Sequence, residues 1–197
     1  MLSILIAAFF AAAGTVRPEP PSASPEEAEV VTKDELSDDD VRDQVNAYLG
    51  SIDTPIRANQ WKVLGPRAVP LLEQIVHSDQ ELPTRRAKAI EGLAALGSPN
   101  ASTLFTEIAA REHEPVVVRF AAVRGLARVT PPRQAAAALK PILEGAKDSR
   151  VRALAAEQLA IRSRGKSCDL VRAQVERESE DSRAHYHRAL GRCPKEK

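Results

Sequence analysis

The clearest feature of the chain is a hydrophobic pattern that recurs at nearly constant spacing. In each repeat an arginine is followed seven residues later by a leucine, and the positions one and four residues after the arginine are mostly apolar. The pairs are Arg57/Leu64, Arg86/Leu93, Arg119/Leu126, Arg152/Leu159 and Arg183/Leu190, separated by 29, 33, 33 and 31 residues. Because positions one, four and seven after the arginine share one side of a helix, each segment is predicted to be an amphipathic α-helix.

A second set of apolar segments lies between these helices. They span residues 66–77, 100–111, 133–145 and 167–178. Each pairs with the segment before it, which predicts a series of helical hairpins. A further helix is predicted over residues 38–49, with Ser37 as its N-cap and Gly50 at its end. The apolar face of this leading helix would consist of Val41, Val45 and Tyr48 or Leu49.

The predicted helix ends carry matching signals. An acid lies shortly before each repeated arginine, where a helix N-terminus favours negative charge. These acids are Asp53, Glu81, Glu114, Asp148 and Glu180. Prolines stand near three of the starts, and glycines near three of the ends, as C-caps do. The glycines are Gly65, Gly97 and Gly191, and the prolines are Pro55, Pro83 and Pro115.

A hairpin of this size cannot bury its own apolar face, so neighbouring hairpins are expected to stack. The expected fold is all-α: a right-handed α-solenoid of about five stacked hairpins, with units starting near residues 52, 82, 115, 148 and 180. The stretches PTRRAKAIEGLAALG, PVVVRFAAVRGLARV and DSRVRALAAEQLAIR resemble HEAT repeats, most of all the short bacterial HEAT-like type that also occurs in phycobilisome lyases. The resemblance covers residues 51–193 and says little about activity.

Tetratricopeptide repeats are the main alternative fold. Trp61-x-x-Leu64-Gly65 matches the start of that pattern, but its later Ala, Phe and Pro positions do not follow. An ankyrin array ranks third, because the chain has no Thr-Pro-Leu-His-x-Ala run. If the chain is a HEAT-like array, His187 occupies the position four residues after the repeated arginine, where the other units are apolar. A polar residue there suits a terminal cap.

The first 40 residues differ from the rest. Residues 2–16 are uncharged and apolar, too short to span a bilayer comfortably, and Ala11 and Ala13 form an A-x-A cleavage pattern, although no Lys or Arg precedes the run. We therefore predict a signal peptide over residues 1–14 and an exported protein, periplasmic or secreted; an uncleaved anchor or a buried helix is the alternative. Residues 15–37 read as a disordered Pro/Glu-rich linker before a repeat domain over residues 38–197.

Charge and composition exclude several function classes. The whole chain has 28 basic and 27 acidic residues, but residues 17–40 hold nine acids and two bases, which leaves +8 on residues 41–197. Few aromatic residues remain to stack bases, so no nucleic-acid partner is predicted. No phosphate loop, zinc motif or catalytic motif appears. A metal site built from several His-Glu pairs cannot be assembled either, because only one such pair exists, at His113-Glu114. No metal or cofactor site is therefore predicted. Because no catalytic motif is present, the chain is expected not to be an enzyme.

The repeated arginines and the two cysteines are predicted to be structural. The resemblance to HEAT repeats implies that Arg57, Arg86, Arg119, Arg152 and Arg183 form a ladder that links neighbouring units. Cys168 would begin the second helix of the fourth unit, and Cys193 would end the first helix of the fifth. These two places are adjacent in a stacked array, so Cys168 and Cys193 are candidates for a disulfide, with two separate thiols as the alternative.

The predicted function is that of a protein-binding scaffold or adaptor in the cell envelope or outside the cell. A groove lined by the second helices would hold the partner. Its candidate positions are Arg67, Glu73, Thr106, Arg111, Lys140 and Arg172. An accessory lyase or chaperone acting on a chromophore is a second hypothesis. A third is that the acidic residues 17–40 occupy the basic groove and regulate it.

Overall fold

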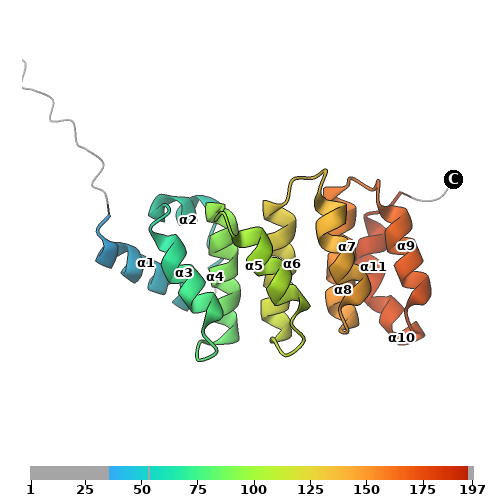
Figure 1. Cartoon of the computed structure of the whole chain (residues 1–197), viewed down its shortest axis with the longest axis horizontal. Helices are drawn as coiled ribbons and strands as arrows, with labels where there is room; N and C mark the ends of the chain where they lie inside the picture. Colours follow the sequence, from blue (N-terminus) through green and yellow to red (C-terminus); the bar gives the residue numbers. More distant parts are fainter. Residues whose placement is uncertain (1–35, 53, 195–197) are drawn as a thin grey trace, which may run out of the picture. The chain divides into compact units, whose positions relative to one another are not determined.

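The computed structural model describes residues 36–52 and 54–194, and this part contains helices and no β-strand. The predicted signal peptide and most of the predicted linker lie outside the described residues. The helices follow one another in the order shown in Figure 1. They are α1 (Asp38–Gly50), α2 (Ala58–Leu64), α3 (Ala68–His77), α4 (Pro83–Leu96), α5 (Ala101–Ala110), α6 (Val116–Val129), α7 (Ala135–Gly145), α8 (Ser149–Arg162), α9 (Cys168–Arg177), α10 (Glu180–Arg183), the 3-10 helix η1 (Ala184–Tyr186) and α11 (His187–Gly191).

Each helix packs against near neighbours in the sequence. Helix α3 packs on α4, α5 on α6, and α7 on α8. Alternate helices also touch, since α4 contacts α6, α6 contacts α8, and α8 contacts η1 and α11 (Figure 1). We refer to α2, α4, α6, α8 and α10–α11 as the first helices, and to α3, α5, α7 and α9 as the second helices. The four predicted second segments match α3, α5, α7 and α9 to within two residues at each end.

The core is built from the predicted apolar stripe of the first helices. In the first four repeats, the leucine seven residues after the arginine is buried. The residue four positions after the same arginine is buried as well. These buried residues are Leu64, Leu93, Leu126, Leu159, Trp61, Ile90, Val123 and Ala156. The second helices add Leu72, Phe105, Leu139 and Val171, which are fully buried. The repeated sequence pattern is therefore the pattern of the packed interface between helices.

Two buried glycines let first helices approach their neighbours closely. Gly92 in α4 and Gly125 in α6 occupy the same repeat position. A Cβ atom at Gly125 would stand 2.9 Å from the ring of Phe105, and one at Gly92 would stand 3.1 Å from Trp61. Any side chain at Gly125 would therefore force the buried Phe105 ring to move.

The leading helix begins as predicted. Ser37 is the N-cap of α1: its hydroxyl accepts a hydrogen bond from the Asp40 amide, and the Asp40 carboxylate accepts one from the Ser37 amide. This capping box begins the helix at Asp38. The hydrogen bonds from Ser37 also lower the pKa of the Asp40 carboxyl. The last three acids of the stretch 17–40 consequently belong to a folded helix and not to a free arm.

The first hairpin differs from the prediction. Helix α2 begins at Ala58, well after residue 52, and Arg57 is its N-cap residue in extended backbone. Residues 54–57 are not helical, because a proline at 55 disfavours helical backbone at the residue before it and offers no amide hydrogen. Arg57 is therefore exposed at a helix end, whereas its counterparts lie inside helices. Gly65 and Gly97 do end helices, each with a positive φ, of 66° and 70°.

For the fifth repeat, the predicted register of the buried side chains is wrong by one residue. Its predicted stripe of Ala184, His187 and Leu190 is exposed, and Tyr186 and Ala189 are buried instead. The helix is broken into α10, η1 and α11, and the tighter 3-10 turn changes the phase of the side chains. Gly191 is the last residue of α11 and not a left-handed C-cap. His187 is exposed at this end of the chain, as a terminal position requires.

Candidate functional site

Arg86 links two successive hairpins through buried contacts. Its Nε donates to the carbonyl of Val76 in the last turn of α3, at 2.9 Å. Its two terminal nitrogens each lie 2.9 Å from a carboxylate oxygen of Glu114, which follows α5. Both side chains are buried. A cation at the C-terminus of a helix stabilises that helix, so Arg86 fixes α3 and the start of the next hairpin together.

Arg119 occupies the same place one hairpin later but has fewer partners. Its Nε donates to the carbonyl of Ala109 in α5, at 3.1 Å. Asp148 precedes the next first helix as Glu114 does, but its carboxylate accepts hydrogen bonds from Arg150 at 2.7 and 3.1 Å. These bonds hold the pKa of Asp148 near 2. One terminal nitrogen of the buried Arg119 has no hydrogen-bond partner in the described part of the chain.

Arg152 sits in the most extensive polar cluster. Its guanidinium donates to the carbonyls of Ala146 and Lys147 at 2.6 and 2.8 Å, and its Nε to a carboxylate oxygen of Glu178 at 2.6 Å. Tyr186 donates its hydroxyl proton to the same carboxylate at 2.6 Å, and Gln174 donates at 2.9 Å.

These contacts shift three pKa values. The hydrogen bonds from Arg152 lower the pKa of Glu178 to about 2, and the carboxylate in turn raises the pKa of Arg152. Burial, together with the bond to Glu178, raises the pKa of Tyr186. At neutral pH the cluster therefore consists of a guanidinium, a carboxylate and a neutral phenol, which join α8, the end of α9 and η1.

The remaining two arginines of the predicted ladder lie differently. Arg57 is an exposed N-cap residue, and its side chain has no hydrogen bond or ion pair to another hairpin in the described part of the chain. Arg183 is exposed, and its Nε donates to the carbonyl of Glu178 at 3.2 Å. A second nitrogen of Arg183 donates to the carbonyl of Glu176 in α9, at 3.4 Å. Contacts from a repeated arginine to the end of the preceding second helix are therefore made by Arg86, Arg119, Arg152 and Arg183.

The structure brings the two cysteines together. Their Sγ atoms are 2.03 Å apart, the distance of a disulfide bond, and their Cα atoms are 5.7 Å apart. Cys168 is the first residue of α9, and Cys193 follows α11 by two residues. The pair therefore ties the end of the last first helix to the start of the second helix before it.

The six candidate positions on the second-helix side all have partners within the chain. Arg67 donates to the carbonyl of Leu36, and Arg172 to that of Pro194. Glu73 accepts from Ser98. The remaining contacts are Thr106 to the carbonyl of Ser102, Arg111 to Glu107, and Lys140 to Glu144 at 3.9 Å. Three of these contacts lie within or at the end of one helix and three join different segments, and a partner would have to displace them.

Large exposed hydrophobic residues lie elsewhere. None of those in the described part of the chain is on a second helix. They are Leu36, Ile52, Val63, Leu82, Val117, Ile161 and Leu190. Apart from Leu36, each belongs to a first helix or to the connection that leads into one. This asymmetry was not predicted, although the sequence signal exists: Val117, Leu154 and Ile161 are apolar positions outside the predicted core stripe of their helices, and Phe120, a predicted stripe position, is only half-buried.

A hollow lies on this side, between α6, α8 and the α10–α11 segment. It has a volume of about 260 Å³, and Phe120, Ala153 and Leu154 provide its apolar wall. Arg150, Glu157, His185, His187 and Arg188 also line it. We call this region, extended along the same faces of α6 and α8, the first-helix surface. It comprises Val117, Phe120, Arg124, Arg128, Leu154, Glu157, Ile161 and Arg188.

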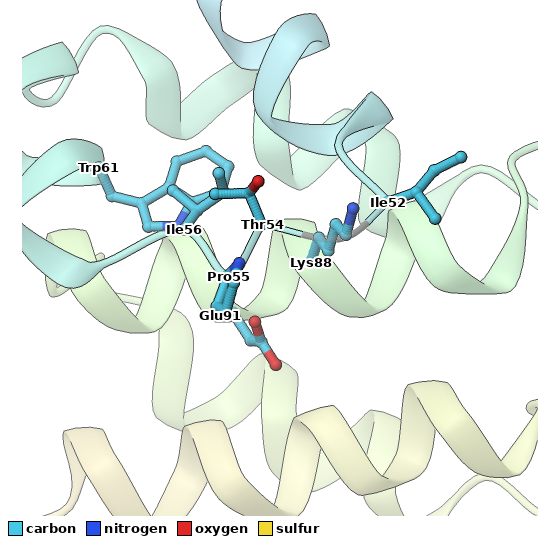
Figure 2. A pocket seen from close by; sticks show the side chains of 7 residues that line it. All are labelled: Ile52, Thr54, Pro55, Ile56, Trp61, Lys88 and Glu91. Atoms are coloured by element: carbon cyan, nitrogen blue, oxygen red, sulfur yellow. The ribbon is translucent and has the colours of Figure 1, made fainter.

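A second hollow, of about 250 Å³, lies near the start of the array. Figure 2 shows the seven side chains that line it, from the α1–α2 connection, α2 and α4. Trp61 and Ile56 supply apolar surface, and Glu91 supplies an exposed carboxylate. Lys88 is engaged, because its ammonium group donates to the carbonyls of Leu49 and Ser51 at the end of α1. Ile52 points away from Trp61 in this view and is 92% exposed.

One hydroxyl–imidazole pair lies near the hollow. Ser149 Oγ lies 3.0 Å from Nδ1 of His185, and within the described residues no carboxylate is hydrogen-bonded to this imidazole. No group of three or more metal-ligating side chains occurs within residues 36–52 and 54–194. No helix in that part is long and apolar enough to cross a membrane.

No family model matches the chain, and neither the curated proteins nor the solved structures give a match.

Proposed function

We propose that the chain is a non-catalytic protein-binding scaffold, built as an α-solenoid of HEAT-like hairpins. The order of helix contacts supports the solenoid, since each hairpin packs on the next one along the chain. The arginines at 86, 119 and 152 support it further, because they recur at one repeat position and reach the end of the preceding second helix each time. A repeat array of this kind presents long surfaces suited to a protein partner.

The observation that carries the proposed function is the composition of the first-helix surface. Val117 and Ile161 are 37% and 41% exposed, and Phe120 and Leu154, on the same two helices, line a hollow. Partly exposed apolar side chains around a hollow, with arginines beside them, are typical of protein-interaction sites. The scaffold is therefore proposed to bind its partner with first helices, and not with the second-helix groove that the sequence pattern favours.

We also propose that the protein works in an oxidising compartment after export. The support is the pair of cysteines at disulfide distance, together with the apolar run at the N-terminus. Disulfides persist in the periplasm and outside the cell, whereas the reducing conditions of the cytosol keep cysteine thiols reduced.

The test is a comparison of two matched double variants in a pull-down from cell-envelope extract, with retained proteins quantified by mass spectrometry. The surface variant carries Val117→Asp and Ile161→Gln. The control variant places the same new residues at equivalent ends of second helices, as Ala137→Asp and Ala110→Gln. The proposal expects one or more proteins that are retained by the wild type and the control but lost with the surface variant. Equal retention by all three, or loss with the control alone, would contradict it.

A further inference from the structure

We infer that the partner binds through an acidic segment that places one large apolar side chain in the hollow between α6, α8 and α11. This inference rests on the proposed function, and it names the chemistry of the partner. It follows from the size of the hollow, the charges around it and the shape of the surface.

The size of the hollow favours a side chain over a small molecule. Its volume of about 260 Å³ lies below the range of roughly 300–1,000 Å³ that is usual for small-ligand sites. Its apolar wall, formed by Phe120 and Leu154, comes from two neighbouring helices that pack directly on each other. An anchor residue of a protein partner typically fills a depression of this kind.

The charges around the hollow favour an acidic segment. Of the two arginines that line the hollow, Arg150 is paired with Asp148, and Arg188 has no carboxylate within ion-pair distance among the described residues. The same holds in that part of the chain for Arg192 at the end of α11 and for Arg124 and Arg128, which are exposed on α6 beyond Phe120. Arg188 and Arg192 line a second depression that adjoins the hollow. Glu157 lines both depressions and is the one carboxylate among their lining residues. An excess of uncompensated guanidinium groups attracts carboxylates, which arginine binds in bidentate geometry.

The shape of the surface argues against a membrane as the occupant. Apolar groups that enter a bilayer protrude from the protein, whereas Phe120 and Leu154 here line a depression. The half-buried Glu157 lies in the same depression, and anionic lipid headgroups would repel it. A membrane surface is therefore not the expected partner at this hollow, and the test includes anionic lipid as the alternative.

The test uses peptides as the probe. A phage-displayed library of random peptides is panned on the purified chain with its disulfide intact, and selected peptides are measured by fluorescence polarisation. The inference expects selected sequences that combine Asp or Glu with Leu, Ile or Phe. Their affinity should fall about tenfold in an Arg124→Ser, Arg188→Ser variant. A control variant removes two exposed arginines near second helices, Arg133→Ser and Arg177→Ser, and should bind as the wild type does.

Each other outcome is decisive. Selected peptides that are not acidic but lose affinity with Phe120→Ser would overturn the inference and leave the proposed binding surface standing. Peptides that respond only to the Arg133 and Arg177 changes would overturn both proposals, as would a library that yields no binder. Binding to vesicles of phosphatidylcholine with phosphatidylglycerol, lost in the Arg124 and Arg188 variant, would replace the peptide with a lipid surface.

Discussion

The partly buried guanidinium of Arg152 in α8 and the buried carboxylate of Glu178 after α9 form an ion pair across 26 positions of the chain. Tyr186 of the last hairpin donates to the same carboxylate. The pair therefore links α8, α9 and η1, and these elements position the α10–α11 segment that forms one side of the hollow. The proposed binding surface is therefore expected to depend on this polar cluster.

Replacing Arg152 with Met is expected to lower the free energy of unfolding by about 3 kcal/mol, because it leaves the buried Glu178 without its cation. Urea unfolding followed by circular dichroism measures this. The matched change Arg57→Met removes an exposed arginine from the equivalent sequence position and is expected to cost less than about 0.5 kcal/mol. Equal, small effects of the two substitutions would contradict the linking role assigned to Arg152.

The stability of the protein is expected to fall in acid because of Glu178. Its pKa is about 2 in the folded state, below the ordinary value of 4.5, so its ionised form stabilises the fold. That stabilisation is complete above the ordinary pKa and is lost as the pH falls toward 2; its size is of the order of 3 kcal/mol. Unfolding free energies measured between pH 6 and pH 2 at constant salt are expected to show this loss.

The control for the acid effect is Glu178→Gln, which removes the titrating group. Its unfolding free energy should depend less on pH over the same interval, with a remaining slope from Asp148, whose pKa is also near 2. An unchanged slope in Glu178→Gln would show that other carboxyl groups cause the acid sensitivity.

Gly125→Ala is expected to destabilise the protein by about 1 kcal/mol, because overpacking against Phe105 exceeds the gain of about 1 kcal/mol in helix propensity. The thermal midpoint measures the change. Gly145→Ala is the matched control, since Gly145 lies at the end of α7 with nothing within 4 Å of the added Cβ. It should be neutral or stabilising. A stabilising Gly125→Ala would mean that the Phe105 ring moves aside at little cost.

The disulfide is expected to stabilise the C-terminal hairpin. A bond that closes a loop of 25 residues contributes about 3.5 kcal/mol by the chain-entropy relation. The double variant Cys168→Ser, Cys193→Ser should therefore unfold at lower urea, and dithiothreitol should shift the wild type toward it. Dithiothreitol should leave the double variant unchanged. If the wild type unfolds identically with and without the reductant, the two thiols are not bonded in solution.

The regular part of the fold was predictable from the sequence because each repeat places the same side chains in the same interface. Leu93, Leu126 and Leu159 are buried at equal spacing, and the Ser37 capping box is a local signal. The ends of the array were not predictable in the same way. At Arg57 a proline two residues earlier prevents the expected helix, and at Tyr186 a 3-10 turn shifts the register by one residue.

The candidate surface was harder to find for a different reason. The spacing that identifies the core stripe says nothing about the opposite face of the same helix, where Val117 and Ile161 lie. Whether Arg111 or Arg124 is available to a partner depends on neighbouring side chains. Arg111 bonds to Glu107 within its own hairpin, whereas Arg124 has no such neighbour in the described residues. Only the packed structure separates the two.

Site-specific photocrosslinking in living cells tests the central claim most directly. A photoreactive phenylalanine analogue is placed at Val117 or Ile161 on first helices, and at Thr103 or Lys140 on second helices, all of them at least partly exposed. The account predicts an adduct of one discrete mass from positions 117 and 161, and none from positions 103 and 140. Adducts that form only at 103 and 140 would contradict it, because the partner would then lie on the second-helix side.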